Sequence, residues 1–358
     1  MVKGCSACGW LTVVWLMSGI ACGASNGDVS DAMVGVLRNA TSAKHLNQSA
    51  ITLTSQGKLQ LPVAILGLPD IYIGVMRRAM RETGIYVTIF TKERMAGKID
   101  LTPFKVIYLE RSVVLFPIQL RRPLLEARER GAKIIAIQWA GAYKDLVNVD
   151  LTEHPYLEGY RKSTNIENMK RFLIYTAVKF FGYKGNVLPP VTPPENGIYH
   201  PDAPKLFASL DEYVKWRPLV TGKPTVAILF MEFSCSTENT AFLDALIRRL
   251  ERFANVVATY GELPERLKPD VVISARVYGA WNKERIEQLD VPLVQTIKIT
   301  HGTLTEWENG PGLVGGTQLG AWITVPEIYG AIEPIVIAWR KRTKEGVVDL
   351  PITERIEK

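Results

Sequence analysis

Short apolar runs rich in β-branched residues alternate with amphipathic helical segments from Leu61 onward, and this alternation limits the fold more than any other feature of the chain. Strands that are separated by helices pair in parallel and bury both faces of their sheet under helices. The predicted strands are 61–67, 86–91, 105–110, 133–138, 225–231, 256–260, 270–274 and 293–300. The predicted helices are 71–82, 114–130, 166–181, 239–253 and 283–288. The pattern therefore predicts an α/β protein with two doubly wound parallel sheets, similar to flavodoxin or Rossmann domains.

The same pattern predicts two lobes and a bridge between them. A chain of 358 residues has room for about two domains of ordinary size. The predicted first lobe covers residues 59–150, a helical and Pro-rich bridge covers 151–222, and the second lobe covers 223–358. Paired lobes of this kind bind ligands in the cleft beyond the carboxyl ends of their strands, so we expect the functional residues there.

The N-terminal segment differs from both lobes. Residues 1–24 combine Lys3 with an apolar stretch over 10–20 and a run of small residues, which is typical of a secretory signal or an anchor. Cys22 follows a small residue, as in the bacterial lipobox, where the cysteine carries a lipid. We therefore expect an exported or membrane-tethered protein, with an uncleaved anchor, or a misplaced start codon in a cytoplasmic protein, as the alternatives. Residues 25–58 are polar and predict a linker, with glycosylation sequons at Asn39 and Asn47.

Charge and motifs exclude several classes of protein. The formal net charge of +7, from 43 basic and 36 acidic residues, is too small to indicate a nucleic-acid-binding chain. No GxGxxG follows the first predicted strand of either lobe and no P-loop occurs, so the chain has no dinucleotide or ATP site of its own. HExxH is absent and no GxSxG follows a predicted strand, which excludes zinc proteases and serine hydrolases.

Two histidines are candidate ligands. His301 lies at the end of a predicted strand and precedes Gly302 and a glycine-rich stretch over 310–316. Glycine lets the backbone approach a flat ligand closely, although composition alone favours a flexible surface loop for this stretch. His200 precedes Pro201 and is as typical of a turn as of a ligand site.

Glu327 and Glu333 are candidate acids or bases, because they lie among apolar and aromatic residues. Burial in such surroundings raises the pKa of a carboxyl group and suits it to proton exchange. A structural role fits equally well, in which these glutamates cap a helix or pair with Arg340 or Lys341.

Eight segments of the chain resemble, in order and spacing, the CobN and magnesium-chelatase H-subunit family, the large subunits of class I tetrapyrrole chelatases. The segments are 158–160 (EGY), 165–168 (NIEN), 197–202 (GIYHPD), 210–216 (LDEYVKW), 291–295 (VPLVQ), 302–307 (GTLTEW), 325–330 (VPEIYG) and 333–336 (EPIV). The resemblance implies a subunit that binds a tetrapyrrole, either a corrinoid or a porphyrin. It also implies a part in inserting cobalt or magnesium, driven by ATP that partner subunits hydrolyse.

The resemblance also implies roles for individual residues. Glu327, in the Pro-Glu motif of the family, would be catalytic by accepting a pyrrole proton or guiding the metal ion, with His301 as a second metal ligand. Tyr329 stands where the family usually has Asp, which leaves the substrate open. The tetrapyrrole contacts expected from the motifs are His200, His301, Gly302, Trp307 and Tyr329.

Two departures from the family favour alternatives. Family members are several times longer, so the chain would need a polypeptide that supplies the missing C-terminal region, together with the chelatase ATPase subunits. The signal-like N-terminus instead favours an exported or lipid-anchored, non-catalytic tetrapyrrole-binding protein, because energy-driven chelation uses cytoplasmic ATP. A two-lobe receptor for some other ligand is a third hypothesis.

Overall fold

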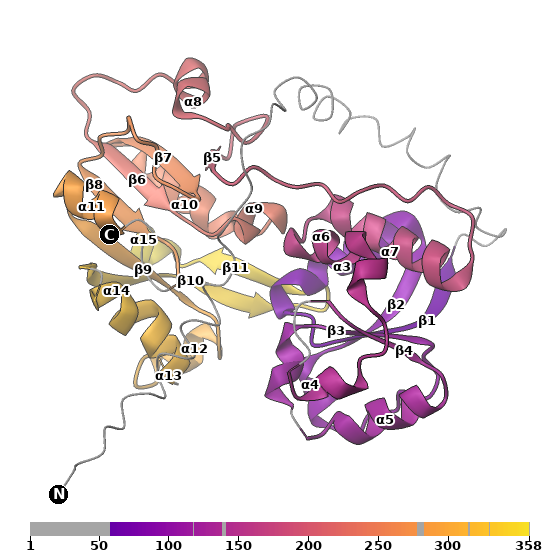
Figure 1. Ribbon diagram of the computed structural model, residues 1–358. Helices are drawn as coiled ribbons and strands as arrows, with labels where there is room; N and C mark the ends of the chain where they lie inside the picture. The colour runs from indigo at the N-terminus through magenta and orange to yellow at the C-terminus, as the bar shows by residue number, and fades with distance from the viewer. Residues whose placement is uncertain are drawn as a thin grey trace, which may run out of the picture. The chain divides into compact units, whose positions relative to one another are not determined.

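The computed structural model describes residues 58–116, 118–137, 141–277, 283–313, 316–328 and 330–357 (Figure 1). All of them belong to one compact unit, Ala50–Lys358. The signal-like segment 1–24, the linker as far as residue 57, and Tyr329 lie outside the described residues. None of the described helices is long and apolar enough to cross a membrane.

The first lobe is a four-stranded parallel sheet in the order β2-β1-β3-β4. Its strands are β1 (Leu59–Leu66), β2 (Ile85–Phe90), β3 (Val106–Leu109) and β4 (Lys133–Ala136). Its helical elements are α3 (Asp70–Thr83), α4 (Lys92–Ala96), η3 (Arg111–Leu115), α5 (Arg121–Glu129) and η4 (Gly141–Leu146). Val63 and Ile65 pack in one core cluster with Met76 of α3, whereas Ala64 and Leu66 pack on the other face. Helices therefore cover both faces, as the continuous apolar strands require.

One predicted helix of this lobe starts too early. The sequence predicts a helix over 114–130, but the chain forms the 3-10 turn η3 and then begins α5 at Arg121. Pro117 has no amide hydrogen to donate inside a helix, which explains the division.

The second lobe is a seven-stranded sheet in the order β11-β10-β9-β8-β6-β7-β5. Its strands are β5 (Gly197–Tyr199), β6 (Thr225–Leu229), β7 (Asn255–Tyr260), β8 (Val271–Ser274), β9 (Leu293–Ile299), β10 (Ile332–Arg342) and β11 (Val347–Pro351). Helices α9 (Phe233–Ser236), α10 (Ala241–Leu250), α11 (Lys283–Leu289) and α15 (Thr353–Glu357) belong to it. The five inner strands are parallel, which confirms the predicted α/β class. The outer strands β5 and β11 are antiparallel, so the prediction of a wholly parallel sheet is wrong at its two edges.

The helices of the predicted bridge divide between the lobes. The elements are η5 (Leu151–Glu153), α6 (Pro155–Lys162), α7 (Ile166–Phe181) and α8 (Leu210–Trp216). Phe172 of α7 lies in the core of the first lobe, and Tyr213 of α8 lies in the core of the second. The Asn165 side chain accepts a hydrogen bond from the amide of Asn168 and begins α7, and Gly182 ends it in the left-handed conformation.

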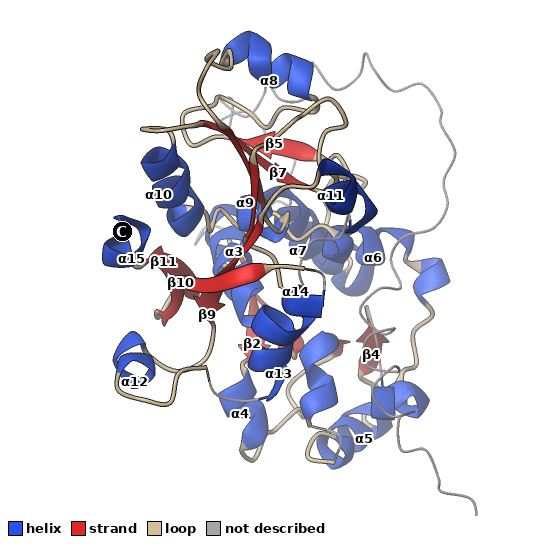
Figure 2. Ribbon diagram, turned by 90° about the vertical axis from the view of Figure 1, so that its left-hand side faces the viewer, coloured by secondary structure: helices blue, strands red, loops and turns tan. Residues whose placement is uncertain are grey.

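An insertion between β9 and β10 contains short helices (Figure 2). They are α12 (Leu304–Glu308), α13 (Gly316–Leu319), the π-helical turn η6 (Gly320–Thr324) and α14 (Val325–Ile328). Trp322 of η6 is buried against Ile297 of β9 and fixes the insertion to the sheet. Single π-helical turns are rare and occur often at functional sites.

Candidate functional site

Both sheets have a point where the winding of the chain reverses. In the first lobe the order β2-β1-β3 places this point at the carboxyl ends of β1 and β3, and in the second lobe the order β7-β6-β8 places it at the ends of β6 and β8. Ligands of open α/β sheets bind at such switch points, because the loops on either side diverge there. The residues that follow these strands are therefore the first candidates for a site.

In the first lobe, Glu110 directly follows β3 and forms a buried ion pair with Arg161 of α6. Two guanidinium nitrogens, Nε and Nη2, donate to the carboxylate oxygens over 2.5 and 3.0 Å. Each side chain is 1% exposed. The guanidinium carbon of Arg161 lies 5.5 Å from the centre of the Tyr72 ring. The first switch point thus combines a buried ion pair with the aromatic ring of Tyr72.

In the second lobe, Glu232 follows β6 and lies near Tyr72 of the first lobe. Burial raises the pKa of the Tyr72 hydroxyl, the charge of Arg161 opposes that shift, and the charge of Glu232 adds to it. Burial also raises the pKa of Glu232, whose main described partner is the Ser236 hydroxyl at 3.4 Å. The two switch points therefore bring an aromatic ring and a carboxyl group together across the lobes.

Arg276 follows β8 and lies along the carboxyl edge of the second sheet. Its Nε donates to the carbonyl oxygen of Phe230 over 3.0 Å, and its Nη2 donates to that of Gly261 over 2.6 Å. These carbonyls lie at the ends of β6 and β7, so the side chain spans three strand ends. The residue is only 3% exposed. Burial lowers the pKa of Arg276 to about 10.

His301 lies just beyond β9, beside Gln318 of α13. The Gln318 side-chain oxygen accepts from the backbone amides of Thr300 and His301 and from Nδ1 of His301, at 3.2, 3.1 and 3.0 Å. This leaves Nε2 as the basic nitrogen of the ring. Burial lowers the pKa of His301, and the charges of Lys92 and Arg342 lower it further. The imidazole is therefore neutral near pH 7, and none of the described residues forms a hydrogen bond with its Nε2.

The structure describes no contact between His301 and Glu327, the predicted catalytic residue. Glu327 is exposed on α14, and its carboxylate makes no hydrogen bond or ion pair with the part of the chain that the structure describes. The expectation of a buried carboxyl is therefore wrong, because Pro326 turns inward and Glu327 outward. Arg340, the expected ionic partner, pairs with Asp349 instead, at 2.7 Å. The role of Glu327 stays a prediction.

Gly302 and Trp307 both have contacts within the protein that give them structural roles. Gly302 has φ +76°, and a side chain there would lie 3.1 Å from the Glu306 carboxylate. That carboxylate completes a capping box with Thr303 at the start of α12. The half-buried Trp307 ring carries the Arg355 guanidinium 5.5 Å from its centre. Their contact with a tetrapyrrole stays a prediction.

His200 lies away from the carboxyl edge. It follows β5, whose antiparallel pairing with β7 carries it toward the amino end of that strand. The ring is buried: Nε2 is 2.8 Å from Glu251, and Nδ1 accepts from the amide of Asp202 at 3.1 Å. Trp216 packs edge-on against it at 5.0 Å. Both ring nitrogens thus have structural partners, and the structure does not bring His200 together with His301.

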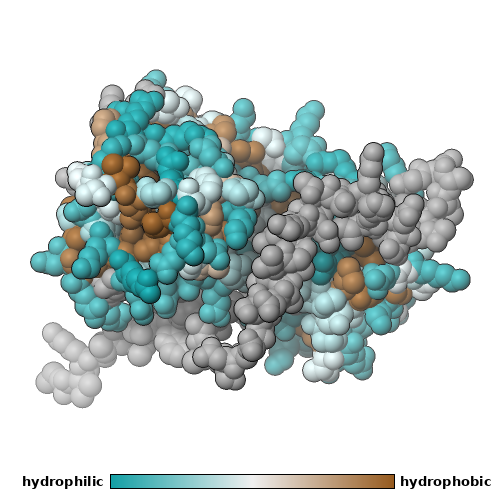
Figure 3. All heavy atoms as spheres, turned by 90° about the horizontal axis from the view of Figure 1, so that it is seen from above, coloured by the Kyte–Doolittle hydropathy of each residue, from teal (hydrophilic) through white to brown (hydrophobic). Residues whose placement is uncertain are grey.

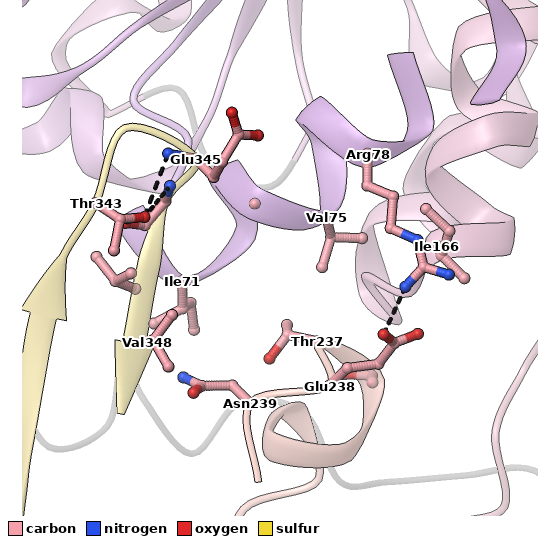
Figure 4. A pocket seen from close by; sticks show the side chains of 14 residues that line it. Ile71, Val75, Arg78, Ile166, Thr237, Glu238, Asn239, Thr343, Glu345 and Val348 are labelled. Atoms are coloured by element: carbon pink, nitrogen blue, oxygen red, sulfur yellow. Dashed lines mark hydrogen bonds and ion pairs between the residues drawn. The ribbon is translucent and has the colours of Figure 1, made fainter. Parts of the chain in front are cut away.

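A cavity of about 210 Å³ lies on the α3 side of the lobe boundary (Figure 4). Its walls are α3, the turn between β10 and β11, and the segment after α9; Arg78 crosses it to pair with Glu238 at 2.5 Å. On the face seen in Figure 3, polar side chains predominate among the described atoms, and one apolar patch lies within the left-hand part of the view. Across the described residues, no group of three or more His, Cys, Asp or Glu is placed to hold a metal ion.

Sequence reasoning missed Tyr72, Glu110, Arg161, Glu232 and Arg276. Three of these end or closely follow predicted strands, so the carboxyl-edge rule applied to every strand would have found Glu110, Glu232 and Arg276. Arg161 carries no such signal, because only tertiary packing brings α6 to the end of β3.

Comparison with known proteins identifies similar sequences over slightly more than half of the chain. A family model described as CobN/Magnesium Chelatase matches residues 158–358. The chain is 29% identical over 197 residues to the magnesium-chelatase H-subunit of Rhodobacter capsulatus, which covers 49% of this chain and 16% of the relative. It is 28% identical over 202 residues to the corresponding protein of Cereibacter sphaeroides, covering 49% and 17%. The chain thus spans about a sixth of these relatives.

Among solved structures, the catalytic subunit of cobaltochelatase from Mycobacterium tuberculosis has a similar fold. The TM-score is 0.53 at 16% sequence identity, and the match covers 82% of this chain and 26% of that one. Because the sequence identity is low, this similarity shows a shared fold only. The matched region is large enough to include residues of both lobes.

Proposed function

The chain belongs to the CobN/magnesium chelatase family, and from this membership we propose that it binds a tetrapyrrole and takes part in metal insertion as a chelatase subunit or part of one. The observation that carries the proposal is the family match over residues 158–358, which includes the whole second lobe and the Pro-Glu motif. The substrates would be a corrinoid or porphyrin and a cobalt or magnesium ion.

Metal insertion requires a base, because inner N–H protons leave the macrocycle as the divalent ion enters it, two from a porphyrin and one from a corrin. Glu327 is our candidate for accepting such a proton or guiding the ion, since its exposed carboxylate is free to meet a ligand. Carboxylate oxygens also suit hard cations such as Mg²⁺. The cations Lys92 and Arg342 near His301 disfavour a free divalent ion there, so His301 fits contact with the macrocycle better.

The energy for insertion would come from a partner. The sequence has no P-loop, so ATP would be hydrolysed by separate chelatase ATPase subunits. The remaining length of the relatives would be supplied by a further polypeptide region, because this chain spans about a sixth of them.

Absorption titration of the full chain with metal-free and metallated porphyrins and corrinoids tests the binding step. We expect a saturable spectral shift with at least one macrocycle. Metallation is then measured with cobalt or magnesium, ATP, added ATPase subunits and a polypeptide that supplies the remaining region of the relatives. Glu327→Gln should lower the rate at least tenfold and leave macrocycle binding intact, because the amide cannot accept a proton.

Glu308→Gln is the matched control, since Glu308 is an exposed glutamate of the same insertion. Equal loss in both variants would reject the role of Glu327. Binding with no metallation under any partner combination would favour the non-catalytic, exported or tethered binding protein that residues 1–24 suggest. Failure to bind any tetrapyrrole would reject the proposed function.

A further inference from the structure

Arg276 differs from the other buried cations of the described chain. Arg161 pairs with Glu110 at 2.5 Å, and Lys298 pairs with Asp349 at 2.6 Å. Arg276 is 3% exposed but has no carboxylate partner within the described ranges. Buried charges in proteins are normally paired, so an unpaired one calls for an explanation.

Hydrogen bonds within the described protein satisfy only part of the Arg276 guanidinium group. The two carbonyl oxygens at the ends of β6 and β7 accept from Nε and Nη2, while Nη1 has no partner among the residues described. Burial alone lowers the pKa of Arg276, to about 10, and no nearby charge contributes. The guanidinium therefore stays protonated at neutral pH and lies at the switch point without a carboxylate partner among the described residues.

The side-chain oxygen of Gln295, at the same edge of the sheet, also lacks a hydrogen-bond partner among the described residues. Gln295 of β9 pairs in register with Ser274, the last residue of β8. Its side-chain nitrogen donates to the carbonyl oxygen of Arg276 over 3.0 Å, but its side-chain oxygen is buried without a partner among the described residues. Water would satisfy the amide oxygen but would not neutralise the guanidinium.

We propose that Arg276 binds a carboxylate of the ligand, and that the site therefore selects tetrapyrroles with free acid side chains over their esters. The selectivity for the macrocycle rests on the proposed function, whereas carboxylate binding at Arg276 does not. A planar guanidinium held by two carbonyls presents its remaining nitrogen in a fixed direction, which suits a carboxylate oxygen.

The first experiment needs no macrocycle. The melting temperature of the full chain is measured with sodium acetate replacing sodium chloride at constant pH and ionic strength. We expect a saturable rise for the wild type, no rise for Arg276→Met, and a wild-type response for Arg266→Met, whose exposed side chain pairs with Asp211. A wild type that does not respond to acetate, or an Arg276→Met variant that does, overturns the proposal.

The second experiment compares a dicarboxylic porphyrin with its dimethyl ester. The wild type should bind the acid at least tenfold more tightly, and Arg276→Lys, which keeps the charge but loses the planar fork, should show a smaller preference. Equal binding of acid and ester by the wild type overturns the selectivity while leaving the proposed function intact. Binding of neither form counts against the proposed function, and the acetate response then decides the carboxylate site separately.

Discussion

Glu110 and Glu232 both follow strands that border a switch point, yet their surroundings are opposite. Glu110 accepts two hydrogen bonds from the buried Arg161, so its charge is compensated. Among the described side chains, Glu232 accepts a hydrogen bond only from the Ser236 hydroxyl, and burial raises the pKa of its carboxyl. Glu110 is therefore held in a buried ion pair, whereas the carboxyl group of Glu232 binds its proton more tightly than a solvated glutamate.

The raised pKa of Glu232 predicts a pH dependence of stability. The folded protein binds this proton more tightly than the unfolded chain, so the contribution to the free energy of unfolding is complete below the ordinary pKa of 4.5. It is lost as pH rises through the raised pKa. Glutamine cannot ionise, so Glu232→Gln does not lose stability in this way. The melting temperature of the variant should therefore rise relative to that of the wild type as pH increases above 4.5.

Each kcal/mol of this difference corresponds to a shift of about 2–4 °C in a domain of ordinary size. Differential scanning calorimetry over a series of buffers, from below the ordinary pKa of a glutamate to neutrality, measures the difference. Glu195→Gln, at an exposed glutamate, should run parallel to the wild type. Parallel curves for Glu232→Gln as well would show that the carboxyl is not perturbed.

At the scale of elements, helix α7 and the hairpin β10–β11 mark the limits of prediction. The sequence predicts 166–181 as a helix and the structure has α7 at Ile166–Phe181, because Asn165 and Gly182 are strong local end signals. The hairpin was missed. The charged run over 340–345 hides the strand pattern, and Asp349 becomes buried only through Lys298 and Arg340.

The turn of this hairpin crosses α3 at a contact between two glycines. Gly346 has φ +153°, and a Cβ atom there would lie 2.8 Å from the backbone nitrogen of Gly74. Gly346→Ala should therefore lower the free energy of unfolding by about 1–3 kcal/mol more than Gly131→Ala. Gly131 also has positive φ, +86°, but open space around it, so it isolates the backbone penalty. Urea denaturation of both variants checks this, and equal losses would exclude a close contact.

At the scale of the whole molecule, exposed ion pairs join the first lobe to the second. Arg78 pairs with Glu238, Arg81 with Glu345, and Arg342 of β10 with Asp70 of α3. Exposed pairs are individually weak and are screened by salt, so the lobes should separate more readily than their cores unfold.

Charge reversal tests the lobe contact. Glu345→Arg places a cation opposite Arg81 and should raise the radius of gyration in small-angle scattering, while the double variant with Arg81→Glu should return it to the wild-type value. Glu129→Arg makes the same charge change on exposed α5 and should have no effect. An unchanged radius in Glu345→Arg, or no recovery in the double variant, would mean that other contacts hold the lobes.

The family resemblance in eight short segments is confirmed by the match over 158–358, and the α/β class by the two sheets. Those segments could not indicate the lobe contacts, because ion pairs between distant exposed residues leave no periodic pattern. The same limit explains why His301 was predicted from its strand end while its partner Gln318 was not.

The hairpin that reaches α3 also sets an order of events during synthesis. The bonds from Arg77, Arg81 and Asp70 to the hairpin connect residues that are 264 to 272 positions apart. At roughly 5–20 residues per second, the ribosome needs about 13–54 s to make that interval. The first lobe therefore leaves the ribosome long before its partner surface exists, and during that time α3 presents arginines and a bare glycine to whatever chaperone or neighbouring chain is present.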